Sequence, residues 1–227
     1  MNKQAFLVHA LSPLHAGTGH SADLVDLPTA RMKGTNIPYL PGSSIKGVLR
    51  QERSGPDDAP RDRLLAAFGP ETAAAGEHAG ALVVGDARLL ALPVRSFIGT
   101  FAHVTSPLLL RLADRDLGWN LPPLELDGRT ARVTASSCCL HGGTLYLEDL
   151  DLPATKGDPT VELWATRLAK LVWPDAEAAF IRRFVIVDDE TMTFLMETAT
   201  QIDARVRMSA ETRTVADGAL WLEESLP

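Results

Sequence analysis

The sequence lacks the features of a membrane protein and of a protein held together by disulfides. No stretch approaches the ~20 apolar residues that cross a bilayer, and the N-terminus has no signal-peptide pattern. The only cysteines, Cys138 and Cys139, are adjacent, so a disulfide between them would be strained. They are also too few for a structural zinc site unless distant histidines join them. We therefore expect a cytoplasmic protein without a membrane partner.

The signatures of several large enzyme classes are also missing. The chain has no P-loop, no Rossmann glycine fingerprint, no nucleophile elbow and no set of kinase motifs. These absences disfavour ATP, NAD and serine-hydrolase chemistry.

Positive charge is scarce as well. A formal net charge of −7 argues against a surface that binds nucleic acid over its whole extent. The basic residues that are present are mostly arginines, at 17 of 22. Because arginine makes bidentate phosphate contacts and stacks on bases, a local basic groove stays open.

The pattern of apolar residues predicts an α+β fold, because strands and helices mix without the regular βαβα alternation of a parallel sheet. Strands are predicted at residues 5–11, 80–92, 184–187, 204–208 and 218–223, with several short antiparallel strands in 121–152. Helices are predicted at residues 44–53, 63–68, 108–117, 161–171, 175–182 and 188–199.

The most informative motif is PYLPGSSIKGVLR, at residues 38–50. Its glycine and two serines offer backbone N–H groups and short hydroxyls where a helix begins, and the unpaired N–H groups of a helix start favour an anion. Lys46 and Arg50 lie four residues apart, so they share one helical face and can both reach a phosphate backbone. In the alternative, Ser43 or Ser44 merely caps the helix and both cations are solvated.

A second motif lies upstream, in a glycine-rich loop. Its side chains His15, His20, Asp23 and Asp26 could bind a divalent metal or perform general acid–base chemistry, although their spacing matches no zinc signature. In the alternative they belong to a solvated loop. A carboxylate close to a phosphate-binding turn is what metal-assisted phosphodiester cleavage requires, and this favours a functional loop.

Other charged residues each allow two interpretations. Arg95 could contact RNA phosphates or pair with a nearby acid. Arg205 belongs to a predicted basic hairpin that could enter a nucleic-acid groove or simply be solvated. Glu223 and Glu224 could assist chemistry, but exposed surface acids are the default expectation.

Three ordered motifs resemble the RAMP proteins of type III CRISPR effector complexes. The first is HAGTGH at 15–20 with DLVDLPTAR at 23–31 and the Gly-Ser-Ser-x-Lys-Gly-x-x-Arg turn. The second, FGP at 68–70 with GALVVGDARLLALPVRSFIGTFAHVTSP at 80–107, is similar to the Cmr4 family of the type III-B complex. The third, GALWLEESLP at 218–227, resembles that family's late motif. Because the family usually continues beyond it, a truncated or shortened form is expected.

The resemblance implies a modified RRM-like, ferredoxin-type core with an inserted domain and a protruding β-hairpin, the thumb. On this expectation residues 1–92 and 184–227 form the core, the thumb covers about 188–217, and residues 93–183 form an inserted α/β segment. Several copies would stack as a filament along the CRISPR RNA, together with other Cmr subunits. The thumbs would displace base pairs between guide and target RNA at regular intervals.

The resemblance also implies an endoribonuclease that cuts complementary target RNA in the assembled complex. The family's catalytic aspartate falls on Asp26, which would act with a divalent metal, Mg or Mn. His15 matches a nearby loop histidine of the family. The residues expected to bind RNA are Gly42, Ser43, Ser44, Lys46, Arg50, Arg31, Arg95 and Arg205.

Three alternatives stay open. The chain could be a non-catalytic RNA-binding scaffold, a Csm3-like backbone subunit of the type III-A complex, or a guide-processing endonuclease. Asp26 favours a target-cutting subunit over a scaffold. The PVRS segment at 93–96 argues against the other two.

Overall fold

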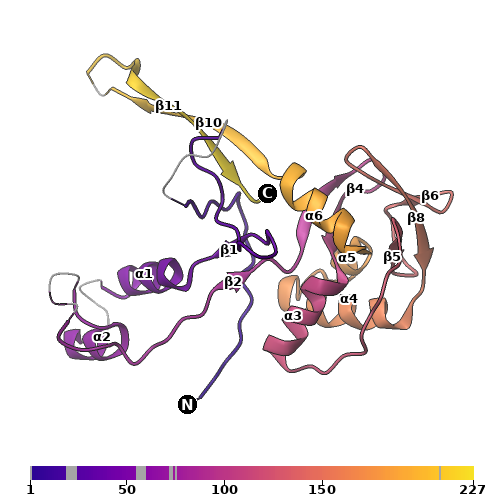
Figure 1. Ribbon diagram of the computed structural model, residues 1–227, viewed down its shortest axis with the longest axis horizontal. Helices are drawn as coiled ribbons and strands as arrows, with labels where there is room; N and C mark the ends of the chain where they lie inside the picture. The colour runs from indigo at the N-terminus through magenta and orange to yellow at the C-terminus, as the bar shows by residue number, and fades with distance from the viewer. Residues whose placement is uncertain (1, 19–24, 55–59, 72–73, 75, 210) are drawn as a thin grey trace. The chain divides into compact units, whose positions relative to one another are not determined.

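The computed structural model describes residues 2–18, 25–54, 60–71, 74, 76–209 and 211–227, and Figure 1 shows the course of the chain. The chain forms a large unit, Met1–Pro38 with Leu89–Pro227, and a small unit, Tyr39–Arg88. Residues 93–183, the segment predicted to be inserted, supply most strands of the large unit's sheet. Of the helices described, none is long and apolar enough to cross a membrane.

The large unit is built on a seven-stranded mixed sheet in the order β3-β4-β9-β5-β8-β7-β6. The strands are β3 (Leu92–Ser96), β4 (Thr100–Thr105), β5 (Ala131–Val133), β6 (Leu140–His141), β7 (Thr144–Leu147), β8 (Leu150–Lys156) and β9 (Phe184–Val187). A further pairing of Ser96 with Leu147 joins β3 to β7 and gives a barrel-like core. The α+β class is therefore confirmed. The all-antiparallel expectation for residues 121–152 is wrong in one respect, because β5 and β8 run parallel.

Four helices pack on this sheet: α3 (Pro107–Leu117), α4 (Pro159–Val172), α5 (Glu177–Ile181) and α6 (Asp189–Thr198). Ser106, Asp158 and Asp188 precede α3, α4 and α6, and the side chain of each accepts a hydrogen bond from a backbone N–H of the first turn. These caps satisfy donors that a helix start leaves unpaired. The predicted bounds of all four helices lie within two residues of the observed ones.

Strand β9 is the centre of the large unit, and all of its residues are buried. Successive side chains of a strand point to opposite faces. Val185 and Val187 accordingly join an apolar cluster that includes residues of α6, whereas Phe184 and Ile186 join a second cluster with α4 and α5. A strand covered on both faces reads as a continuous apolar run, and this is why the sequence predicted its bounds correctly.

The small unit is a pair of helices closed by a short ladder. Strand β1 (Tyr39–Leu40) pairs antiparallel with β2 (Ala87–Arg88), and α1 (Gly42–Glu52) and α2 (Arg61–Phe68) lie between them in sequence. The long strand predicted at 80–92 is wrong, because within it only β2 and the first residue of β3 belong to a ladder.

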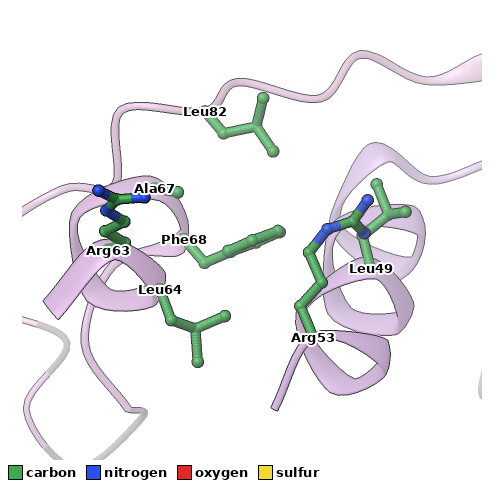
Figure 2. A pocket seen from close by; sticks show the side chains of 7 residues that line it. All are labelled: Leu49, Arg53, Arg63, Leu64, Ala67, Phe68 and Leu82. Carbon is green, nitrogen blue, oxygen red and sulfur yellow. The ribbon is translucent and has the colours of Figure 1, made fainter. Parts of the chain in front are cut away.

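An apolar cleft of about 380 Å³ lies between α1 and α2. Figure 2 shows Phe68 of α2 pointing toward Leu49 and Arg53 of α1. The remaining lining residues are Arg63, Leu64, Ala67 and Leu82. Because the lining contains no acid, histidine or thiol, the cleft lacks the groups that acid–base or nucleophilic chemistry needs.

A long hairpin completes the large unit. It consists of β10 (Gln201–Met208) and β11 (Val215–Ser225), with a register irregularity between Val206 and Met208. Figure 1 shows it as a two-stranded arm that extends away from α6. The expected thumb, at about 188–217, thus included α6 and omitted the last part of β11.

Residues 5–11 form no helix or strand, contrary to the predicted first strand. Phe6, Val8 and Leu11 are exposed in this segment. Alternating apolar residues indicate a strand only where a neighbouring edge offers hydrogen-bond partners, and the ladders of the described residues do not include this segment.

Buried His103 makes the stability of the large unit depend on pH. Its ring lies on β4, stacks on Phe180 at 4.7 Å and meets Phe101 and Trp173 edge to face. Burial first, and then the positive charges of His9 and Arg183, lower its pKa from 6.5 to about 4. Between pH 6.5 and about 4, His103 therefore binds a proton in the unfolded chain but stays neutral in the folded chain.

We expect the free energy of unfolding to fall by about 3 kcal/mol as the pH drops from 6.5 to about 4, because of this residue alone. Denaturant unfolding of the wild type and of His103→Phe across this range measures it. The difference between the two curves should rise with pH and level off above 6.5. Parallel curves would contradict the assignment.

Candidate functional site

Loops from the N-terminal part of the chain complete the outer edge of β11. Leu222 O accepts from Leu27 N–H at 3.0 Å, and Glu224 N–H donates to Leu27 O at 3.0 Å. Leu14 and Leu226 form an isolated antiparallel bridge. These bonds satisfy backbone groups that an edge strand leaves open. The loops with the predicted catalytic residues thus lie along the end of the last strand.

Asp26 lies where this pairing ends. Its Oδ2 accepts a hydrogen bond from Leu222 N–H at 2.8 Å, and the residue is exposed. Within the part of the chain that the structure describes, Oδ1 has no hydrogen-bond partner. One carboxylate oxygen therefore fixes the exposed side chain, and the other is not engaged by the described residues.

His15 meets the same strand two residues further on. Its Nδ1 lies 2.6 Å from the backbone oxygen of Glu224. Because a carbonyl oxygen only accepts, Nδ1 carries the hydrogen, and Nε2 of the neutral ring keeps its lone pair. Gly17 packs closely on this ring, since a Cβ at residue 17 would lie 2.6 Å from Nε2. A side chain at residue 17 would therefore collide with the imidazole, and glycine avoids this.

Glu224 is the functional candidate that sequence reasoning missed. It is 8% exposed, so the default expectation of an exposed acid is wrong. Its Oε2 accepts from Thr29 N–H at 2.9 Å, and its Oε1 pairs with Arg31 at 2.7 Å. Its backbone oxygen accepts from the Thr29 hydroxyl at 3.1 Å. The tandem acids of the late motif were the only signal in the sequence.

The glycine-serine turn begins α1 in the small unit. Pro41 is the N-cap and no side chain caps the helix, so the alternative of a capping serine is wrong. Gly42 is buried, and its N–H donates to Asp86 Oδ1 at 2.8 Å. Ser43 and Ser44 are exposed. A carboxylate of the chain thus occupies the first N–H, and the two serines present their hydroxyls to solvent.

The two cations of α1 differ in their surroundings. Lys46 is half-buried, and Arg50 donates from Nη1 to Pro70 O at 2.9 Å. Arg50 is therefore partly engaged in holding the segment after α2. Lys46 is the freer of the two for a phosphate.

The other candidate arginines all pair with acids of the chain. Arg31 binds Glu224 and also donates to Asn36 O at 3.4 Å. Arg95 pairs with Glu148 at 2.9 Å, and Arg205 pairs with Glu223 at 3.1 Å. Arg95 and Arg205 keep much of their side chains exposed, at 72% and 48%, so both can still meet a phosphate. Arg31 is only 18% exposed, so its main role is the ion pair with Glu224.

The described residues contain no group of three or more His, Cys, Asp or Glu side chains that could hold a metal ion. His20 and Asp23, which the sequence placed in this loop, lie outside the described residues. A Mg²⁺ ion usually keeps several waters and is held by one or two carboxylates together with substrate phosphates. Asp26 supplies one carboxylate, which is within the number of protein ligands that such an ion takes.

The structure therefore brings His15, Asp26 and Arg31 to one strand of the large unit. The turn at Gly42–Ser44, with Lys46 and Arg50, belongs to the small unit. Arg95 lies on β3 and Arg205 on the hairpin.

Comparisons with known proteins show which sequences and solved structures this chain resembles. The sequence model of the RAMP superfamily matches residues 7–227. The CRISPR system Cmr endoribonuclease Cmr4 of Pyrococcus furiosus is 35% identical over 230 residues, covering 99% of this chain and 78% of that protein. A crystal structure of oligomeric Cmr4 from the same organism superimposes with a TM-score of 0.73 at 27% identity, over 96% of this chain and 75% of the other. A cryo-EM structure of the type III-B Cmr-beta complex bound to cognate target RNA shares the fold, with a TM-score of 0.68 at 20% identity over 96% of this chain and 78% of that one.

Proposed function

Because the chain belongs to the Cmr4 family of the RAMP superfamily, we propose that it is a backbone subunit of a type III-B CRISPR complex that binds CRISPR RNA and cuts complementary target RNA. The relative named above is an endoribonuclease, and solved neighbours are an oligomeric Cmr4 and a Cmr complex with target RNA. The observation that carries the proposal is that β11 fixes Asp26 through Leu222 N–H and that the backbone oxygen of Glu224, on the same strand, fixes His15. Further copies, other Cmr subunits, guide and target are the proposed partners.

The proposed reaction uses the 2′-hydroxyl of the target RNA as nucleophile. This oxygen attacks the adjacent phosphorus and the bond to the 5′-oxygen breaks. The departing oxygen takes a proton from water, so that a 2′,3′-cyclic phosphate and a 5′-hydroxyl result. His15 Nε2 is suited to take the proton of the 2′-hydroxyl, because its Nδ1 is held by a carbonyl. Asp26 Oδ1 would hold a divalent ion, Mg or Mn, which supplies charge stabilisation at the phosphate when bound.

RNA binding is assigned to separate surfaces. The turn at Gly42–Ser44, with Lys46 and Arg50, would hold the guide backbone, with Arg95 as a further contact. The β10–β11 hairpin would be the thumb. Its exposed apolar residues Ile202, Val206 and Leu220, together with Arg205, suit an arm that separates stacked bases.

Finer points of architecture belong to the proposal too. We propose a modified RRM-like core. An RRM has a four-stranded sheet, and the sheet of this chain is larger but also has helices packed on it. The division into a core and an inserted segment at 93–183, a filament of several copies and a cytoplasmic location stay predictions. The relatives are Cmr4 proteins, so the type III-A alternative is not retained.

The alternative is a non-catalytic scaffold, and the absence of a metal-binding cluster among the described residues favours it. Reconstitution with guide and labelled complementary RNA separates the two functions. Metal-dependent fragments spaced at a fixed interval support the nuclease. A complex that binds the target and leaves it whole supports the scaffold.

Lys46→Ala is expected to weaken guide binding and to lower the slope of log affinity against log salt by about one, because one phosphate contact is lost. Guide affinity at several salt concentrations measures this slope. Lys170→Ala is the matched control, since it removes the same charge from an exposed position in the last turn of α4. Equal slopes for both variants and the wild type would remove Lys46 from the guide site.

A further inference from the structure

Glu224 joins the base of the hairpin to the loop that carries Asp26. In the hairpin, Glu224 lies opposite Ile202, next to the first pair of the ladder, Gln201 with Ser225. In the loop, Asp26 is followed at once by Leu27, whose backbone pairs with β11. The same strand therefore forms one side of the arm and the surface on which Asp26 is fixed.

The polar groups of Glu224 are almost all used for this junction. The carboxylate binds Thr29 N–H and the Arg31 guanidinium, at 2.9 and 2.7 Å. The backbone oxygen takes the Thr29 hydroxyl at 3.1 Å and His15 Nδ1 at 2.6 Å, and the N–H donates to Leu27 O at 3.0 Å. A single residue thus sets the position of both loops that hold the proposed catalytic groups.

A buried ion pair is a poor choice for stability alone, because apolar residues of similar volume often stabilise a fold as well or better. What it does supply is a fixed geometry, since both carboxylate oxygens have directed partners. The hydrogen bonds from the loops fall on Leu222 and Glu224, at the base of β11, and on Leu226 just after it. Beyond them the arm is open, and Val215 and Leu220 are 48% and 65% exposed.

We propose that Glu224 is a positioning residue that couples the β10–β11 hairpin to the Asp26 loop, so that cutting depends on how RNA sets the arm. This inference rests on the proposed function. RNA that loads the arm moves β11, and β11 carries Leu222, the residue that holds the Asp26 carboxylate. Because Glu224 binds the Asp26 loop to β11, the loop moves together with the strand.

The test uses complexes assembled with guide RNA and purified by size, with single-turnover cutting of a labelled target. Glu224→Gln keeps the volume and one acceptor but removes the charge that faces Arg31. We expect the cutting rate to fall about 10- to 100-fold, because a misplaced catalytic group costs up to that much. The dissociation constant for target should stay within about twofold, since the carboxylate is buried away from RNA.

Asp188→Asn is the matched control. Asp188 is also buried, at 6% exposure, and accepts two hydrogen bonds from Thr191, but it belongs to the cap of α6. This variant should lower the melting temperature and cut at the wild-type rate. A rate loss equal to that of Glu224→Gln would mean a general effect of stability and would overturn the inference.

Coupling itself is measured by a double-variant cycle. Replacing residues 206–220 by an Asn-Gly turn shortens the arm while the base of the ladder stays. If the arm acts through Glu224, its shortening should lower the rate much less in the Glu224→Gln background than in the wild type. Rate losses that multiply would show independent action and would overturn the inference.

The outcomes separate the inference from the function. A Glu224→Gln complex that cuts at the wild-type rate, while Asp26→Asn does not cut, overturns the inference alone. A wild-type complex that binds target and never cuts it overturns both. Should Glu224→Gln fail to assemble, Thr29→Val removes only the hydroxyl bond to Glu224 O, and its rate should fall about threefold or more. An unchanged rate there would contradict the coupling.

Discussion

Asp26→Asn is expected to reduce target cutting in the assembled complex by about 10²- to 10⁴-fold, the usual contribution of a positioned acid–base or metal-holding group. The amide keeps the shape of the side chain, and its oxygen can still accept the bond from Leu222 N–H that fixes the carboxylate at 2.8 Å. What disappears is the negative charge at Oδ1. Because the loop keeps its place, guide and target affinities should stay at wild-type values.

Single-turnover cutting with purified complexes measures the effect, and a filter-binding assay of guide and target confirms that only chemistry has changed. Asp151→Asn provides the control, since it makes the same substitution at an exposed position on β8. Cutting at the wild-type rate by Asp26→Asn would exclude Asp26 from the reaction. The scaffold function would then be the better description of the chain.

Local signals predicted the helices of the large unit well. The helix at Pro107–Leu117 is an example, because Ser106 caps its start and Gly118 ends it in the left-handed region, with φ at 66°. Both residues act within one turn of the helix end, so their effect can be recognised in a short window of sequence. Strand β9 was equally clear from its continuous apolar run.

Strand pairing could not be predicted in the same way. Residues 5–11 and most of 80–92 have strand-like composition, but they form no ladder of that length. Whether such a segment pairs depends on an edge that distant parts of the chain supply. The parallel pairing of β5 with β8, which are separated by two other strands in sequence, has the same origin.

The candidate site shows the same limit. The resemblance assigned roles to Asp26 and His15, and the roles themselves stay predictions. No spacing rule links Thr29 to Glu224, which lie 195 positions apart, and Gly42 meets Asp86 across 44 positions. The sequence predicted an exposed surface acid at Glu224 and gave no signal at Asp86. Each of the two carboxylates accepts from a backbone N–H group, and such a group leaves no trace in residue type.

Gly42→Ala is expected to destabilise the small unit by about 3 kcal/mol or more and to abolish guide binding with it. A Cβ at this position would lie 2.2 Å from the backbone oxygen of Val84 and 2.9 Å from the carbonyl carbon of Gly85. These are backbone atoms, so the turn itself must move. The bond from Gly42 N–H to Asp86, at 2.8 Å, would be lost at the same time.

Gly47→Ala in the same helix is the matched control with the opposite sign. Apart from its chain neighbours and the helix's own backbone, no atom of the described residues lies within 4 Å of the Cβ that it would add. Alanine in an exposed helix interior should therefore stabilise α1 by about 0.5–1 kcal/mol. Hydrogen exchange of the α1 and α2 amides, together with guide affinity, measures both variants. If both alanine variants changed hydrogen exchange of the α1 and α2 amides equally, the close contact between Gly42 and Val84 would not explain why residue 42 is glycine.

If Gly42→Ala lost stability and still bound guide, the glycine-serine turn would be structural and the guide would be held by Lys46 and other cations.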